Sequence, residues 1–124
     1  DSKGVPTEVV CSVRMPDGHG PLERQTQPNP HQVVFDPSGR WVAIPDLGAD
    51  RLHLASYEPI SGELTLRHRA NVAPGGGPRH LVFHPTNGCL YLFTEMDTAI
   101  YVFGFDQQSG ELSSKKRASY RKPC

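Results

Sequence analysis

The sequence lacks the features that mark several large classes of protein. No apolar run approaches the ~18 residues of a membrane-spanning helix, and no secretory signal peptide is recognisable near the start. The 13 basic and 13 acidic residues cancel to a formal net charge of zero. This balance gives no general reason to expect nucleic acid or an anionic membrane as a partner. We therefore expect a cytoplasmic protein with no membrane and no nucleic acid among its partners.

Cysteine is scarce as well, with 3 residues at Cys11, Cys89 and Cys124. An odd and sparse set does not form a disulfide framework, and no CxxC pair suggests a zinc site. We expect free thiols in a reducing compartment and no bound metal. A helical period is also missing, since no stretch of about ten residues repeats its apolar positions every 3.6 residues.

Glycine and proline, in contrast, are abundant, with 12 of each in 124 residues. Together with a hydrophobic fraction of 36%, they predict short strands separated by many turns. The apolar residues fall in tight clusters, which excludes the disordered class. The length allows one domain or a piece of one.

The chain repeats a stretch that begins at Pro30. The run Pro30–Gly39 returns as Pro78–Gly88, an offset of 78 − 30 = 48 residues, with Asn87 as one inserted residue. Further on, Ser61–Leu64 returns as Ser109–Leu112 with the same offset, 109 − 61 = 48. A period of about 40–50 residues built from strands is typical of propeller blades.

Each repeat unit is predicted to form an antiparallel meander of four strands. The predicted strands are Gln32–Asp36, Trp41–Ile44, Leu52–Tyr57 and Glu63–Arg69 in the first unit, and His80–His84, Cys89–Thr94, Ile100–Phe105 and Glu111–Lys116 in the second. The strand from Trp41 is wholly apolar, as expected for a strand covered on both faces. The strand from Leu52 alternates in polarity, which is typical of a half-buried strand.

These strands predict an all-β fold, a β-propeller of four-stranded antiparallel blades. The blades occupy residues 28–72 and 73–118. Residues 1–27 are interpreted as the end of an incomplete blade, with a hairpin over Val9–Val13 and Leu22–Thr26, and residues 119–124 as a basic, frayed tail.

About two and a half blades cannot close a ring, because closed propellers have about four to eight. Either the remaining blades lie outside this chain, or several copies associate through their open blade faces, or the piece is marginally stable. The start at Asp1 instead of Met agrees with a processed, trimmed or partial chain.

The repeat also predicts where functional residues gather. The first strand of each propeller blade lines the central channel, so residues that enter this strand reach the channel mouth. His31 and Arg79 are equivalent by the repeat, and Asp46 and Glu95 are equivalent at the exit of each second strand, where 95 − 46 = 49 because Asn87 intervenes. We therefore expect a His, an Arg and one or two carboxylates at one mouth.

Chemistry at such a mouth would follow from these residue types. Arg79 can hold a carboxylate or phosphate through a bidentate fork, and His31 can transfer a proton near neutral pH. Glu95, in a partly enclosed mouth, can act as an acid or a base. A simpler interpretation stays open, in which Arg79 and Glu95 form an inter-strand salt bridge and His31 caps a loop.

Other residues have weaker cases. His84 is interpreted as a turn residue, because Asp36 takes its place in the sister unit. Gly75–Gly77 is interpreted as a flexible connection between blades, although successive amides of this kind can also form an anion nest. His53 and His68 have no suitably spaced partner and are expected to be surface or packing residues.

The same residues carry a resemblance to a known family. The run Pro30–Arg40, the motif Pro45–Asp50 (PDLGAD) and the run Gly77–Leu81 with Phe83–Pro85 resemble the lactonase family of seven-bladed propellers, over roughly residues 28–113. That family includes the propeller-type 6-phosphogluconolactonases and the fungal carboxy-cis,cis-muconate cyclases. The resemblance implies a seven-bladed ring, chemistry on lactones of acidic substrates, and neither a metal nor an organic cofactor.

Site residues are implied by the cyclase branch of the family. Its proposed site contains a His, two Arg and a Glu, of which the His falls on His31, one Arg on Arg79 and the Glu on Glu95. The second Arg would come from a later blade, beyond Cys124. The resemblance therefore implies three catalytic candidates in this chain and a site that is incomplete without further blades.

Three functions stay open at this point. The first choice is hydrolysis of 6-phosphogluconolactone, with a small anionic lactone as the partner molecule. The runner-up is carboxy-cis,cis-muconate cyclase, a lactonising isomerase, and Arg79 does not discriminate between the two because both substrates are anionic. The third is a non-catalytic or truncated propeller that serves as a binding scaffold.

Overall fold

The computed structural model describes residues 2–119 and contains eight strands in two four-stranded antiparallel sheets. The first sheet contains β1 (Val34–Phe35), β2 (Trp41–Asp46), β3 (Arg51–Glu58) and β4 (Glu63–Asn71), and the second contains β5 (Pro78–Phe83), β6 (Cys89–Thr94), β7 (Ala99–Phe105) and β8 (Leu112–Ser119). Each sheet is a meander in which consecutive strands pair, as predicted. Within residues 2–119, no helix is long and apolar enough to cross a membrane.

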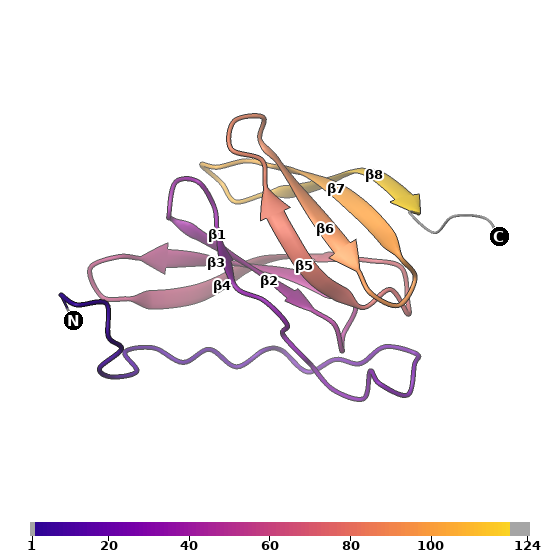
Figure 1. Ribbon diagram of the computed structural model, residues 1–124, viewed down its shortest axis with the longest axis horizontal. Coiled ribbons are helices and arrows are strands. Elements are labelled where there is room, and N and C mark those ends of the chain that lie inside the picture. The colour runs from indigo at the N-terminus through magenta and orange to yellow at the C-terminus, as the bar shows by residue number, and fades with distance from the viewer. Residues whose placement is uncertain (1, 120–124) are drawn as a thin grey trace.

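The two sheets pack face to face, as Figure 1 shows, and their shared core contains most of the large apolar side chains. Leu52 and Leu54 of the first sheet meet Leu90 and Leu92 of the second, and all four side chains are fully buried. Each buried leucine contributes about 1.5–3 kcal/mol relative to an exposed one. Neither sheet could bury this face alone, so the pair is the smallest cooperative unit of the fold.

Polar contacts also join the two sheets. Trp41 packs in the core, and its indole Nε1 donates a hydrogen bond to the carbonyl of Gln107 at 2.9 Å. Along the inner strands, the side-chain Oε1 of Gln32 accepts a hydrogen bond from the backbone N–H of Leu81 at 2.7 Å. Hydrogen bonds between side chains and backbone therefore join the two repeat units in addition to the apolar core.

The turn after β1 is stabilised by Asp36, because its buried carboxylate accepts hydrogen bonds from the backbone N–H groups of Ser38, Arg40 and Trp41. Burial alone would raise the pKa of Asp36, but the Ser38 hydroxyl and the surrounding N–H groups outweigh burial and lower it. In the second sheet His84 has the same role, which confirms its interpretation as a turn residue: its Nδ1 accepts from two N–H groups of the following turn.

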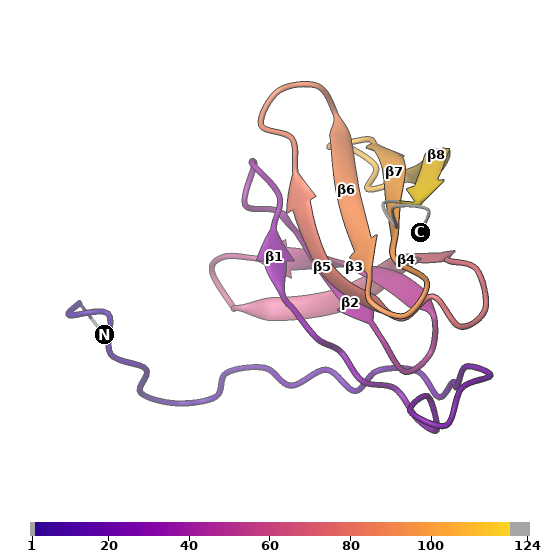
Figure 2. The ribbon, with the colours of Figure 1, turned by 45° about the vertical axis from the view of Figure 1, so that its right-hand side comes forward.

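The segment before the repeat differs from the prediction. Residues 2–29 contain no strand, so the hairpin expected over Val9–Val13 and Leu22–Thr26 is wrong. Figure 2 shows an extended chain that passes beneath the first sheet before it enters β1. Met15, from this segment, packs against Val42, Ile44 and Ala55 on the face of the first sheet that points away from the core.

Because this segment covers the outer face of the first sheet, the burial of β3 also differs from the prediction. Residues 52–55 of β3 are buried on both faces, whereas the alternating pattern predicted a half-buried strand. His53 is accordingly a buried residue, only 2% exposed. The last predicted strand was too short as well, because β8 continues past Lys116 to Ser119, the first residue of the predicted tail, which pairs with Ala99 of β7. Residues 120–124 lie outside the described residues.

Two glycines with the same backbone conformation allow strain and packing to be separated. Gly39 and Gly110 have φ values of 71° and 78°, but a Cβ at Gly39 would meet nothing within 4 Å, whereas a Cβ at Gly110 would clash with the Trp41 ring. We expect Gly39→Ala to cost about 1–2 kcal/mol of unfolding free energy and Gly110→Ala about 1–3 kcal/mol more. Urea unfolding monitored by Trp41 fluorescence measures both, and equal losses would contradict the packing role of Gly110.

Candidate active site

The predicted site residues come from three chain segments at one end of the strands. Arg79 and His80 begin β5, and Glu95 follows directly after β6. His31 precedes β1, where its backbone N–H donates a hydrogen bond to the carbonyl of Pro45 at 2.9 Å. Antiparallel pairing of β5 with β6 brings the start of one strand to the end of the other, so Arg79 and Glu95 become neighbours.

The geometry joins these residues in two pairs. Arg79 Nε lies 3.8 Å from Glu95 Oε2, an ion pair of the kind that the simpler interpretation expected. The rings of His31 and His80 meet edge to face, with centroids 5.2 Å apart and planes at 77°. His31, Arg79 and His80 are exposed, whereas Glu95 is half-buried. Arg79, His80 and Glu95 line one cavity and His31 contacts His80, so both pairs belong to one cluster that a ligand can reach from solvent.

A shallow cavity accompanies the cluster. It measures about 270 Å³, and its walls are formed by Arg79, His80, Phe93, Thr94 and Glu95. The exposed Phe93 contributes an apolar part of the lining, and Arg79 and Glu95 contribute the ion pair. Such a combination suits a small molecule with an anionic group at one end and a ring at the other.

A further cation that the repeat did not predict lies at the same site. Arg24 Nη1 donates a hydrogen bond to Glu95 Oε1 at 3.3 Å, so that Glu95 lies between two guanidinium groups. Arg24 has no repeat counterpart and lies in an irregular loop, and no sequence signal assigns it to the site.

Asp46, the second carboxylate expected at the mouth, is instead a buried structural residue, and that expectation is wrong. Its side chain is fully buried, and its Oδ1 accepts hydrogen bonds from the N–H groups of Asn29, Gly48 and Ala49. Its Oδ2 lies 3.5 Å from Nε2 of the equally buried His53. Burial would raise the pKa of Asp46, but His53 and these N–H groups outweigh burial and lower the pKa.

Asp50, at the end of the PDLGAD motif, organises the backbone beneath the site. Its buried carboxylate accepts hydrogen bonds from Gln25 Nε2 at 2.6 Å and from the N–H groups of Gly75 and Gly77 at 2.8 and 2.9 Å. The glycine run is therefore a nest for an internal carboxylate, not the flexible connection that we expected. The carbonyl of Gly77 then accepts from the N–H of Glu95 at 2.8 Å, which fixes the backbone of the site.

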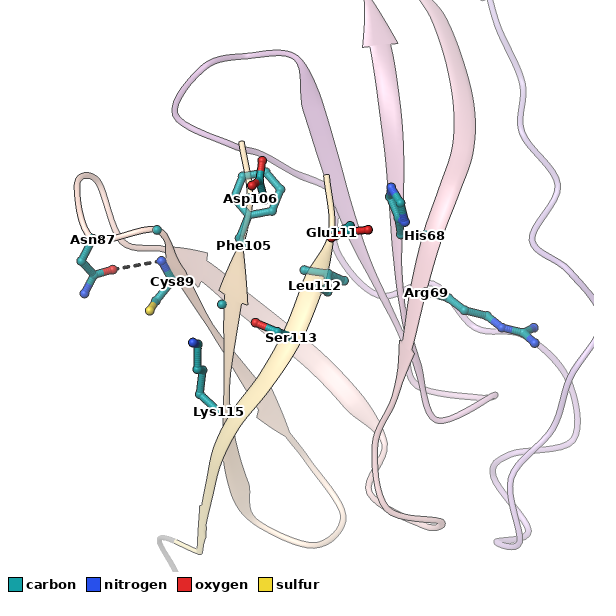
Figure 3. A pocket seen from close by; sticks show the side chains of 12 residues that line it. His68, Arg69, Asn87, Cys89, Phe105, Asp106, Glu111, Leu112, Ser113 and Lys115 are labelled. Carbon is teal, nitrogen blue, oxygen red and sulfur yellow. Dashed lines mark hydrogen bonds between the residues drawn. The ribbon is translucent and has the colours of Figure 1, made fainter. Parts of the chain in front are cut away.

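A larger hollow at the other end of the strands holds none of the predicted residues. It measures about 660 Å³, and its lining includes Asn87, Cys89 and Lys115. Figure 3 shows that its charged side chains do not converge, because Lys115 and Arg69 extend in different directions. Within residues 2–119, no group of three or more His, Cys, Asp or Glu side chains could hold a metal ion. Cys11 and Cys89 are free thiols.

Two packed four-stranded meanders, each beginning with an inner strand at the site, define this protein as part of a β-propeller. The sequence model of the family described as Lactonase, 7-bladed beta-propeller, matches residues 1–123. The chain therefore belongs to the seven-bladed lactonase family.

Known proteins of this kind resemble the chain over most of its length. It is 37% identical to the 6-phosphogluconolactonase of Bacillus subtilis over 94 residues, which are 76% of this chain and 26% of that protein. A solved structure of a protein from Lactobacillus plantarum superimposes with a TM-score of 0.83 at 26% identity, covering 90% of this chain and 32% of the other. For the Pseudomonas aeruginosa periplasmic gluconolactonase, the TM-score is 0.75 at 28% identity, with coverages of 89% and 32%. The chain thus spans only about a quarter to a third of these relatives.

The lowered pKa of Asp46 predicts how stability depends on pH. A carboxyl whose pKa is lower in the folded state stabilises the fold above its unfolded value, here 3.8, and this contribution is lost as pH falls through the folded value. We expect Asp46→Asn to cost about 1–3 kcal/mol at pH 7, with the difference from wild type shrinking as the pH falls below 3.8.

Urea unfolding at a series of pH values measures this difference. Asp17→Asn is the matched control, because the Asp17 side chain is 93% exposed and pairs with Arg14, which is 90% exposed. Its effect on stability should be small at every pH. A difference between wild type and Asp46→Asn that stays constant with pH would contradict the assignment.

Proposed function

We propose that the complete protein is a lactonase that hydrolyses 6-phosphogluconolactone at the cluster of His31, Arg79, His80 and Glu95. The observation that carries the proposal is the cavity at one end of the strands, which is lined by the ion pair of Arg79 and Glu95 and by His80, while His31 contacts His80 from beside it. The similarity to the 6-phosphogluconolactonase of Bacillus subtilis supports the choice of substrate. Further blades complete the site in this proposal, since the chain spans only part of its relatives.

Hydrolysis of a lactone needs a water activated for attack and a proton for the leaving oxygen. The water oxygen bonds to the carbonyl carbon, the ring C–O bond breaks, and one proton of the water passes to the ring oxygen. His31 is suited to carry this proton, because imidazole exchanges protons near neutral pH and the ring is exposed beside the cavity. Glu95 is the second candidate for proton transfer, and its ion pairs also orient the arginines.

Substrate binding falls to the arginines in this scheme. Arg79 carries a permanent positive charge with a planar donor fork that fits carboxylate and phosphate groups. Its side chain is 45% exposed, so an anion can reach it without disrupting the fold. The cytoplasmic location and the association of copies through open blade faces stay predictions, and one similar structure is of a periplasmic gluconolactonase.

Replacing Arg79 should weaken substrate binding more than it slows the chemistry. We expect Arg79→Gln to lower kcat/KM for 6-phosphogluconolactone about 10- to 100-fold, mainly through KM, because a charge-assisted contact is lost. Arg69→Gln is the matched control, since Arg69 is exposed at the distant hollow and its loss changes the net charge equally.

Steady-state hydrolysis in the complete protein, followed by acid release, measures both variants. Unchanged kinetics in Arg79→Gln would refute the site. Turnover of a carboxymuconate instead of the sugar lactone would identify the cyclase alternative. Wild-type protein without turnover of either substrate would favour the scaffold alternative.

The two histidines can be told apart by matched substitutions. We expect His31→Asn to lower kcat about 10²- to 10⁴-fold, because a proton-transfer group is lost. His80→Asn should change kcat less than tenfold, since His80 lines the cavity but transfers no proton in this scheme. Single-turnover kinetics of both variants measure the chemical step. A larger effect of His80→Asn than of His31→Asn would exchange their assigned roles.

A further inference from the structure

Arg24 is a charged residue that sequence repetition does not assign to the site, yet it contacts Glu95. We propose that Arg24 is a second anion-binding residue and that Arg24 and Arg79 together hold the phosphate group of the substrate. The inference rests on the proposed lactonase function for the identity of the substrate. Three features support the inference: the conformation of the loop that carries Arg24, the hydrogen bonds that hold this loop, and the charges around Glu95.

The loop that carries Arg24 is closely held at its base. The N–H of Gly20 donates to the carbonyl of Gln25 at 3.0 Å, and the N–H of Gln25 donates to the carbonyl of Leu22 at 2.9 Å. The side chain of Gln25 is fully buried and donates to the carbonyl of Leu47 at 2.9 Å. A Cβ at Gly20 would collide with that side chain, so a larger residue there would displace the buried amide of Gln25.

The same hydrogen-bond network holds the partner of Arg24. Gln25 binds Asp50, Asp50 binds the N–H of Gly77, and the carbonyl of Gly77 binds the N–H of Glu95. Arg24 and Glu95 are therefore attached to one rigid unit, although they are 71 residues apart in sequence. The same hydrogen bonds therefore position both Arg24 and Glu95, which distinguishes this pair from an incidental contact between two surface side chains.

The net charge of Arg24, Arg79 and Glu95 favours the binding of an additional anion. Two guanidinium groups surround a single carboxylate, so the group carries a net positive charge. The side chains of Arg24 and Arg79 are 66% and 45% exposed, whereas that of Glu95 is 28% exposed. Each guanidinium has five N–H donors, and the contacts with Glu95 involve one nitrogen of each. Donors of both arginines can therefore turn to a ligand.

Phosphate fits this arrangement better than carboxylate does. A carboxylate has two oxygens, and one arginine fork satisfies both. A phosphate monoester has three terminal oxygens and about −1.5 to −2 charge near pH 7, so that two arginines can bind it at once. Glu95 keeps both guanidinium groups in place before the ligand arrives, which reduces the ordering cost of binding.

Calorimetric titration of the complete protein with 6-phosphogluconate and with gluconate tests the proposal, because the two ligands differ only in the phosphate. We expect Arg24→Gln to weaken binding of 6-phosphogluconate about 10- to 100-fold and to leave gluconate binding within about twofold. Arg24→Lys should recover part of the loss, since it restores the charge but not the fork. Arg14→Gln is the matched control, because Arg14 is 90% exposed and pairs with Asp17.

The outcomes separate this inference from the proposed function. Equal binding of 6-phosphogluconate by wild type and Arg24→Gln, or an equal loss for both ligands, would overturn the role of Arg24 even if the protein hydrolyses the lactone. A phosphate-specific loss in Arg24→Gln without lactone turnover by wild type would support the anion site and refute the hydrolase. Thermal unfolding of Arg24→Gln at the wild-type temperature excludes misfolding as the cause.

Discussion

The carboxylate of Asp50 is the constraint on which the site end of this structure depends. The carboxylate is buried, the residue has a backbone φ of 53°, and the carboxylate accepts hydrogen bonds from two chain segments that are far apart in sequence, at Gln25 and at Gly75–Gly77. A buried charge is tolerated only where such donors replace water. Because the donors include the connection between the two sheets, the same interaction sets the blade spacing and the position of Glu95.

Much of the fold could be predicted because it repeats. The offset between Pro30 and Pro78 identified two equivalent meanders, and all eight strands begin within two residues of their predicted starts, although β1 is reduced to two residues. Residues 2–29 could not be predicted in this way, since they have no second copy for comparison. Their extended path follows from the uncovered apolar face at Val42 and Ala55, a tertiary cause that no local pattern carries.

Repeat equivalence also predicted where part of the candidate site lies, but it assigned one residue wrongly and missed another. His31, Arg79 and Glu95 lie at the same end of the strands, where repeat equivalence predicted them. Asp46 shares that equivalence but is buried, because the loop after β2 uses its carboxylate to bind backbone N–H groups. Arg24 was missed because it reaches the site across 71 residues of sequence, through an anchor that only the folded chain creates.

The hydrogen bond between Gln32 and Leu81 has a consequence for association between molecules. β5 is an edge strand of its sheet, and edge strands offer open N–H and C=O groups to strands of other chains. Gln32 occupies the outward N–H of Leu81 with a side chain, so a foreign strand would have to displace it before pairing. At Leu81 the inner edge of the second blade is thus closed to strand addition by a side chain of the neighbouring blade.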